Sequence, residues 1–142
     1  MSQEVQILLL PKNYESEDEY YLYDNTLFTI NKILNQSGVN SSYLDDKPIQ
    51  LLEQRSVEWF LPTLYISYSL YIENKELYEV ALELIKEYIL KSLPFTRREE
   101  SSVKLKVIVE KSKNKTTKSI EYNGPVEGLS NIKDSIEKIC NE

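Results

Sequence analysis

The stretch Val103-Lys-Leu-Lys-Val-Ile-Val-Glu110 alternates apolar and polar side chains, with Ile108 as its one exception. A period of two predicts a half-buried β-strand. A polar turn follows at residues 111–115, and residues 116–122 alternate again. The two runs together predict a β-hairpin. Asn123-Gly-Pro125 ends it, and a final helix is predicted from the spacing of Leu129, Ile132, Ile136 and Ile139.

Upstream of Pro94 the apolar spacing is helical instead of alternating. Asn74 is placed to cap a helix that ends before Pro94, and its apolar residues follow the 3.6-residue period: Leu77, Val80, Ala81, Leu84, Ile85, Tyr88 and Ile89. Because proline suits the first turn of a helix, Pro62 predicts a further helix from Leu61 to Ile72. The two helices are either separate or one bent helix.

The N-terminal part predicts a strand, a loop and a helix. Val5–Leu10 is an apolar run ending at Pro11, which indicates a strand buried on both faces and central in its sheet. Residues 13–24 are interpreted as an acidic, tyrosine-rich loop, and Asp24 or Asn25 would cap the helix that follows. Ile49–Glu53 fits a strand or a helix start equally well.

These elements predict one α+β domain over residues 1–142. Its small sheet contains the N-terminal strand and the C-terminal β-hairpin, with the helices packed mainly on one face.

The amino-acid composition excludes several classes of catalytic and ligand-binding site. The chain has 142 residues, no histidine, one cysteine and three glycines. Histidine-dependent catalysis, histidine or multi-cysteine metal sites and glycine-rich phosphate loops are therefore excluded. Asp45-Asp46 and the acidic run at residues 15–19 are interpreted as solvated loops and not as a metal site. We expect no catalytic residues, no cofactor, no metal and no enzyme activity.

Charge and hydropathy point to a cytoplasmic protein. The net charge is −6, with fifteen acidic and seven basic residues in residues 1–96 and eight against ten in residues 97–142. The acidic excess repels the phosphate backbone of a nucleic acid, so we expect no nucleic-acid partner. No targeting signal is recognisable, and the most apolar stretch, residues 59–72, is too short to span a membrane.

Aromatic and basic residues are the candidates for partner binding. Trp59 and Phe60 resemble interface anchors, although large aromatic side chains are more often part of a core, where Trp59 would hold the helix start in place. The helix predicted over Leu61–Ile72 is apolar on nearly every side, so Tyr65 and Tyr68 are expected to meet a second copy or an effector subunit, unless the chain itself buries them. The hairpin lysines Lys111, Lys113 and Lys115 could dock an acidic partner, or could simply protect a strand edge.

Two segments carry a resemblance. Trp59-Phe-Leu-Pro-Thr-Leu64, with the helices after it, and Ile120-Glu-Tyr-Asn-Gly-Pro-Val-Glu-Gly-Leu129, after a lysine-rich hairpin, resemble small effector-associated component proteins of bacterial conflict and defence loci. The resemblance covers the layout of residues 56–139. It implies a non-enzymatic partner protein in a defence system, and it carries over no active-site residue.

The sequence therefore favours a protein-protein interaction component, an adaptor or regulator of an effector. The alternative is an acidic immunity-type inhibitor of a basic toxin, in which residues 14–24 would mimic a nucleic-acid backbone. A carboxylate-and-metal hydrolase is a third class.

Overall fold

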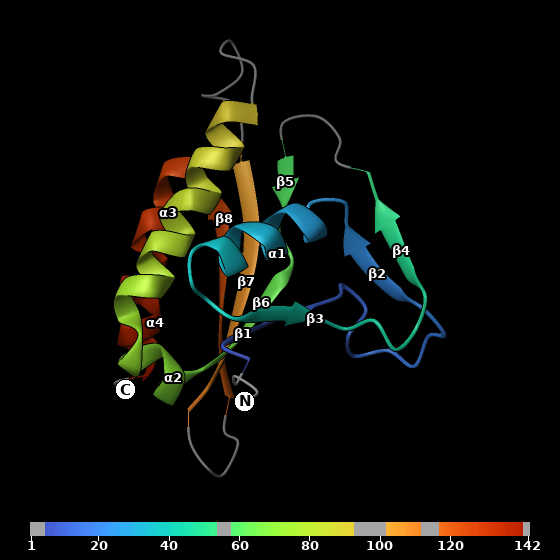
Figure 1. Cartoon of the computed structure of the whole chain (residues 1–142), viewed down its shortest axis with the longest axis horizontal. Coiled ribbons are helices and arrows are strands. Elements are labelled where there is room, and N and C mark those ends of the chain that lie inside the picture. Colours follow the sequence, from blue (N-terminus) through green and yellow to red (C-terminus); the bar gives the residue numbers. More distant parts are fainter. Residues whose placement is uncertain (1–4, 54–57, 93–101, 112–116, 141–142) are drawn as a thin grey trace.

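Two sheets and four α-helices make up the part of the chain that the structure describes (Figure 1). This computed structural model describes residues 5–53, 58–92, 102–111 and 117–140, with the backbone alone for residues 58, 59, 139 and 140. In chain order the elements are β1 (Ile7–Leu10), β2 (Tyr21–Asp24), α1 (Leu27–Gln36), β3 (Ser41–Tyr43), β4 (Ile49–Leu52), β5 (Glu58–Phe60), β6 (Thr63–Ser67), α2 (Tyr68–Glu73), α3 (Lys75–Ser92), β7 (Ser102–Glu110), β8 (Thr117–Gly124), the 3₁₀ helix η2 (Val126–Asn131) and α4 (Ile132–Cys140).

The larger sheet has six strands and mixed pairing. β1 lies between β3, which is parallel to it, and β6, which is antiparallel. β7 pairs antiparallel with β8 along one edge, so the parallel strands β5 and β6 share its other edge. The predicted α+β class, the hairpin and the central position of the N-terminal strand are confirmed.

A bulge separates β5 from β6. Phe60 is in register with Lys104, but Leu64 is in register with Val107, so residues 61–63 lie opposite only two residues of β7. An extra residue of this kind bends a strand and interrupts its ladder of hydrogen bonds. Pro62 has no N–H to contribute to a ladder, and at a bulge none is needed. This explains why a proline can lie inside the sheet.

The helix predicted from Leu61 to Ile72 is wrong over most of its length. Residues 63–67 form β6, a strand between β1 and β7, and only Tyr68–Glu73 is helical. The side chains of Leu64 and Ile66 are 3% and 1% exposed, because they point into the core of the chain itself. The wide apolar surface that motivated an interface on this segment is therefore mostly core.

The helices cover one face of the larger sheet. Ile66 of β6 and Val107 of β7 meet Leu34 of α1, Tyr78 of α3 and Ile136 of α4 around one small cavity. β7 alternates accordingly: Val103, Leu105, Val107 and Val109 are buried in this core. The intervening side chains, Lys104 and Lys106 among them, belong to the opposite face. The prediction that the helices pack mainly on one face is confirmed.

The remaining helix predictions are largely confirmed. α3 begins directly after Asn74, whose carbonyl oxygen accepts a hydrogen bond from the Leu77 N–H at 3.0 Å. Asn74 also separates α3 from α2, so the two helices are distinct. The first helix lies where the apolar spacing placed it, but its N-cap residue is Thr26 and not Asp24 or Asn25. Ile132, Ile136 and Ile139 belong to α4 as predicted, whereas Leu129 lies before it in the 3₁₀ helix η2. None of the described helices is both long enough and apolar enough to cross a membrane.

A second, two-stranded sheet projects beside the first (Figure 1). It pairs β2 with β4 in parallel, and Tyr21 is in register with Ile49. The Tyr23 hydroxyl donates a hydrogen bond to the Leu9 carbonyl oxygen at 2.7 Å and so ties this sheet to β1. The prediction that residues 13–24 form only a loop is therefore wrong at residues 21–24, and the undecided residues 49–52 are a strand.

Candidate functional site

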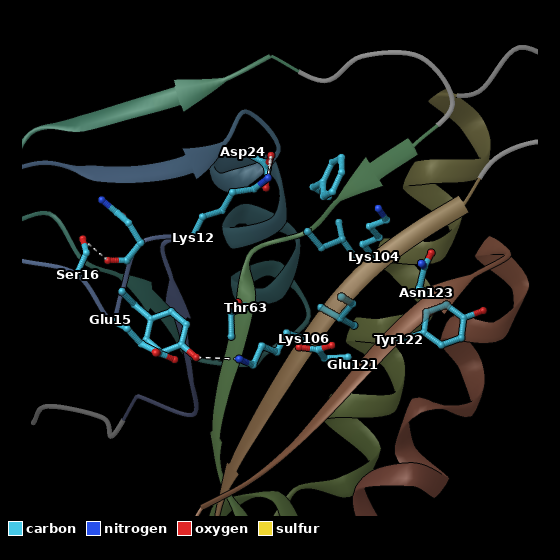
Figure 2. Close-up of a pocket in the computed structure, with 15 residues that line it drawn as sticks. Lys12, Glu15, Ser16, Asp24, Thr63, Lys104, Lys106, Glu121, Tyr122 and Asn123 are labelled. Atoms are coloured by element: carbon cyan, nitrogen blue, oxygen red, sulfur yellow. Dashed lines mark hydrogen bonds and ion pairs between the residues drawn. The ribbon is translucent and has the colours of Figure 1, made fainter. Parts of the chain in front are cut away.

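An open hollow of about 780 Å³ lies on the sheet face that the helices leave uncovered (Figure 2). Its side chains come from segments far apart in the chain: the loop after β1, the end of β2, the bulge between β5 and β6, and the facing positions of β7 and β8. The alternation of β7 places Lys104 and Lys106 in it, and in-register pairing adds Asn123 and Glu121 from β8.

One wall combines an aromatic ring with two lysines. The Lys12 ammonium lies 4.1 Å from the centre of the Phe60 ring, and the Lys104 ammonium lies 5.1 Å from it. Lys12 also forms an ion pair with Asp24 at 3.3 Å. The Asp24 side chain is buried, and burial raises the pKa of its carboxyl above the ordinary 3.8, against the opposing effect of Lys12.

The opposite wall is the loop after β1. The Lys106 ammonium donates a hydrogen bond to the Tyr14 hydroxyl at 2.9 Å, and this bond raises the pKa of Lys106. Asn13 holds the loop against β2, since its side-chain oxygen accepts from the Leu22 N–H at 2.9 Å and its side-chain nitrogen donates to the Tyr20 carbonyl at 3.0 Å. The loop is therefore a fixed wall of the hollow.

The charges of the hollow balance. Lys12, Lys104 and Lys106 are offset by Glu15, Asp24 and Glu121, and the same surface includes Phe60 and Tyr14. A nucleic-acid site would instead present an excess of positive charge to the phosphates. Mixed charges around aromatic side chains are typical of surfaces that bind proteins.

The structure brings two of the predicted partner-binding residues to this face. Phe60 lines the hollow, and Tyr65 lies further along the same face, where its hydroxyl donates a hydrogen bond to the Glu110 carboxylate. That bond raises the pKa of Tyr65 to about 12. Tyr68 lies in α2 with its ring stacked on Tyr71, away from the hollow. Lys111 is a half-buried residue directly after β7.

The other predicted partner-binding residues cannot be assigned to this face. The Trp59 side chain lies outside the described residues, although its backbone is part of β5, and so do Lys113 and Lys115. The sequence indicated Lys104 and Lys106 through their alternation. Lys12 was missed, and Tyr14 and Asp24 were considered only as part of the segment 14–24 of an inhibitor, because only the long-range packing of β2 and its loop brings all three to the hollow.

An acidic lobe lies at the end of the smaller sheet. We use this name for five exposed residues, Glu17, Asp18, Glu19, Asp45 and Asp46. They precede β2 and β4, and the parallel register brings the starts of these two strands together. The Tyr21 hydroxyl donates to Asp46 at 2.5 Å, and this bond lowers the pKa of Asp46. Hydrogen bonds from Ser16 and Asn13 lower the pKa of Asp18, and the bond from Ser16 has the larger effect.

Among the described residues no three acidic or cysteine side chains lie close enough together to hold a metal ion. No protein-family model matches the chain, and comparisons with curated proteins and with solved structures find no similar protein.

Replacing Lys12 with methionine tests the pairing inside the hollow. The variant leaves the buried Asp24 carboxylate without its cation. We therefore expect the free energy of unfolding to fall by about 1–2 kcal/mol at pH 7. This is less than the cost of breaking a fully buried pair, because the Lys12 side chain is 39% exposed. Lys12 opposes the effect of burial, so the pKa of Asp24 should be raised further in the variant than in the wild type, and the native variant then gains more stability from protonation than the wild type does. The loss should therefore shrink as the pH falls towards 4.

Urea unfolding at pH 7 and pH 4 measures this loss. The double variant Lys12→Met, Asp24→Asn should recover most of the stability at pH 7, and Lys32→Met, on the exposed side of α1, serves as the control. A loss that is equal at both pH values would contradict the pairing.

Proposed function

We propose that the chain is a non-enzymatic protein-interaction component, an adaptor or regulator of an effector, that acts in the cytoplasm. Its partner binds on the uncovered sheet face. The observation that carries the proposal is the open hollow, where aromatic and charged side chains from four parts of the chain meet on the sheet face opposite the described helices.

The composition of the hollow supports a protein as its occupant. Phe60 and Tyr14 supply aromatic surface, and Lys12 and Lys106 are held in place by Asp24 and Tyr14. Side chains that are already ordered lose little conformational freedom when a partner binds. The resemblance of residues 56–139 to effector-associated proteins supports the same function.

The binding test uses the proteins encoded beside this one as candidate partners. Lys104→Glu combined with Lys106→Glu reverses two charges in the hollow and is expected to weaken binding at least about tenfold, or about 1.4 kcal/mol. The matched control is Lys32→Glu combined with Lys138→Glu, which makes the same charge change on exposed positions of α1 and α4. Calorimetry measures the affinities, and circular dichroism checks the fold. Equal losses in both pairs would contradict the proposal.

The acidic lobe favours a second candidate function, an immunity-type inhibitor of a basic toxin. Its five carboxylates gather charge that the sequence divides between two segments, and such a field speeds encounter with a basic protein. The same experiment separates the two functions. Binding that is lost on Asp45→Lys combined with Asp46→Lys, but kept in the hollow variant, would favour the inhibitor.

A further inference from the structure

The outer edge of β4 is open to another strand. β4 lies at the rim of the molecule, beyond β2 and far from α3 and α4 (Figure 1). Within the described ranges it pairs with β2 alone. Leu51 is 44% exposed and Leu52 is 38% exposed, although they point to opposite faces of the strand. Apolar surface is therefore available on both sides of this edge.

The hydrogen bonds identify which backbone groups face outward. The Tyr21 N–H donates to the Pro48 carbonyl and the Asn25 N–H donates to the Leu52 carbonyl, each at 2.8 Å. In a parallel ladder alternate residues of one strand bond to the neighbour, so Gln50 and Leu52 face β2. Ile49 and Leu51 consequently turn their N–H and C=O groups away from it.

This edge lacks the usual protection against pairing. Natural sheets blunt their edges with charged side chains, prolines, bulges or very short strands. In the larger sheet the edge strand β8 includes Lys118 and Glu121, and the edge strand β3 has only three residues. β4 is Ile-Gln-Leu-Leu, without a charge, a proline or a bulge. Its composition favours strand addition.

The neighbouring charge indicates what kind of strand would add. The acidic lobe lies at the start of β4, and Glu53 follows the strand. Lys47 sets one positive charge against the five carboxylates of the lobe, since its ammonium donates to the Asp18 carbonyl oxygen at 2.8 Å. A second copy would place each acidic lobe beside the other copy's lobe in parallel pairing, or beside its Glu53 in antiparallel pairing, and four residues bury far less than the ~1,200 Å² of a stable interface. A basic segment would instead gain from the same field.

We propose that the outer edge of β4 binds an extended segment of a partner protein by strand addition. The segment hydrogen-bonds to Ile49 and Leu51, places apolar side chains beside Leu51 and Leu52, and carries lysine or arginine where it passes the acidic lobe. Binding at this edge does not depend on the hollow or on the function proposed for it.

A random twelve-residue peptide library displayed on phage, selected on the immobilised full chain, supplies the probe. We expect enriched peptides that alternate apolar residues and carry two or more basic residues at one end. Leu51→Pro removes an outward N–H and leaves the ladder to β2 intact, so synthetic copies of these peptides should bind the variant at least about tenfold more weakly. Leu51→Lys keeps the backbone group and adds the charge of a protected edge, and it should weaken binding as well if the proline variant does not fold.

Charge reversal supplies the matched comparison. Asp45→Lys combined with Asp46→Lys should weaken peptide binding at least about tenfold, whereas Glu76→Lys combined with Glu87→Lys, the same charge change on exposed positions of α3, should leave it unchanged. Four results would overturn the proposal: no enriched peptide, enriched peptides without basic residues, binding lost only in the hollow variant, or a wild-type dimer that Leu51→Pro converts to a monomer.

Discussion

Replacing Tyr78 with alanine is expected to lower the free energy of unfolding by about 3–5 kcal/mol, as is typical for truncation of a buried aromatic side chain. The Tyr78 side chain is 2% exposed and packs edge-on against Tyr71, with ring centres 5.2 Å apart. Its hydroxyl donates a hydrogen bond to the Gln6 carbonyl oxygen at 3.0 Å. The variant therefore opens a cavity between α3 and the sheet and removes the bond that joins α3 to the start of β1.

A second variant separates packing from hydrogen bonding. Tyr78→Phe keeps the ring and removes the hydroxyl, so its expected cost is about 1 kcal/mol. Val80→Ala, at an exposed position of the same helix, should cost less than about 0.5 kcal/mol. Urea unfolding followed by circular dichroism measures all three. If Tyr78→Ala cost no more than Val80→Ala, α3 would not be docked on the sheet through this residue.

The elements that were predicted correctly are those whose own residue periodicity determines whether they form a helix or a strand. The alternation around Val103–Glu110 marks a strand with one buried face, and the 3.6-residue period after Asn74 marks a helix with one buried side. Both patterns are visible in sequence because each element buries a single face against one layer. Ile108 is the exception in the alternation. Its side chain belongs to the sheet face opposite the helices, where it is buried beside Tyr65, its register partner in β6.

Long-range pairing decides the elements that were predicted wrongly. Leu61, Leu64 and Ile66 are apolar at spacings that fit a helix as well as a strand, and Pro62 fits a helix start as well as a bulge. Hydrogen bonding to β1 on one side and β7 on the other selects the strand. No window of residues around Pro62 contains that information, because β7 begins forty residues later.

The residues of the candidate site likewise fall into those that the sequence pattern could predict and those that only tertiary packing brings together. Lys104 and Lys106 could be placed on one face from their spacing, and Phe60 was identified as an aromatic anchor. Lys12 and Asp24 lie twelve residues apart, and their pairing requires that β2 folds back beside the end of β1. A wall built by tertiary packing leaves no periodic signal in the sequence.

Alkaline pH is expected to destabilise the chain strongly between pH 10 and pH 12. Burial raises the pKa of Tyr23 to about 12, and burial also raises the pKa of Tyr71 and Tyr78. The unfolded chain loses these protons near pH 10, whereas the native state holds them to higher pH. Because the native state then binds more protons than the unfolded state, the free energy of unfolding falls as the pH rises through this window.

Comparison with Tyr23→Phe isolates the contribution of one hydroxyl. At pH 8 the variant lacks the bonds that the Tyr23 hydroxyl makes with the Leu9 carbonyl oxygen and the Leu44 N–H, so it should be less stable than the wild type by about 1–2 kcal/mol. A pKa that moves from 10.0 to about 12 costs the wild type about 1 kcal/mol by pH 11 and about 2 kcal/mol by pH 12, and the variant has no such cost. The stability difference between the two proteins, measured by urea unfolding from pH 8 to pH 11.5, should therefore shrink steadily above pH 10. Lysine deprotonation affects both proteins alike and cancels in this difference. If the difference instead stayed constant across the range, the Tyr23 hydroxyl would ionise as readily in the native state as in the unfolded chain.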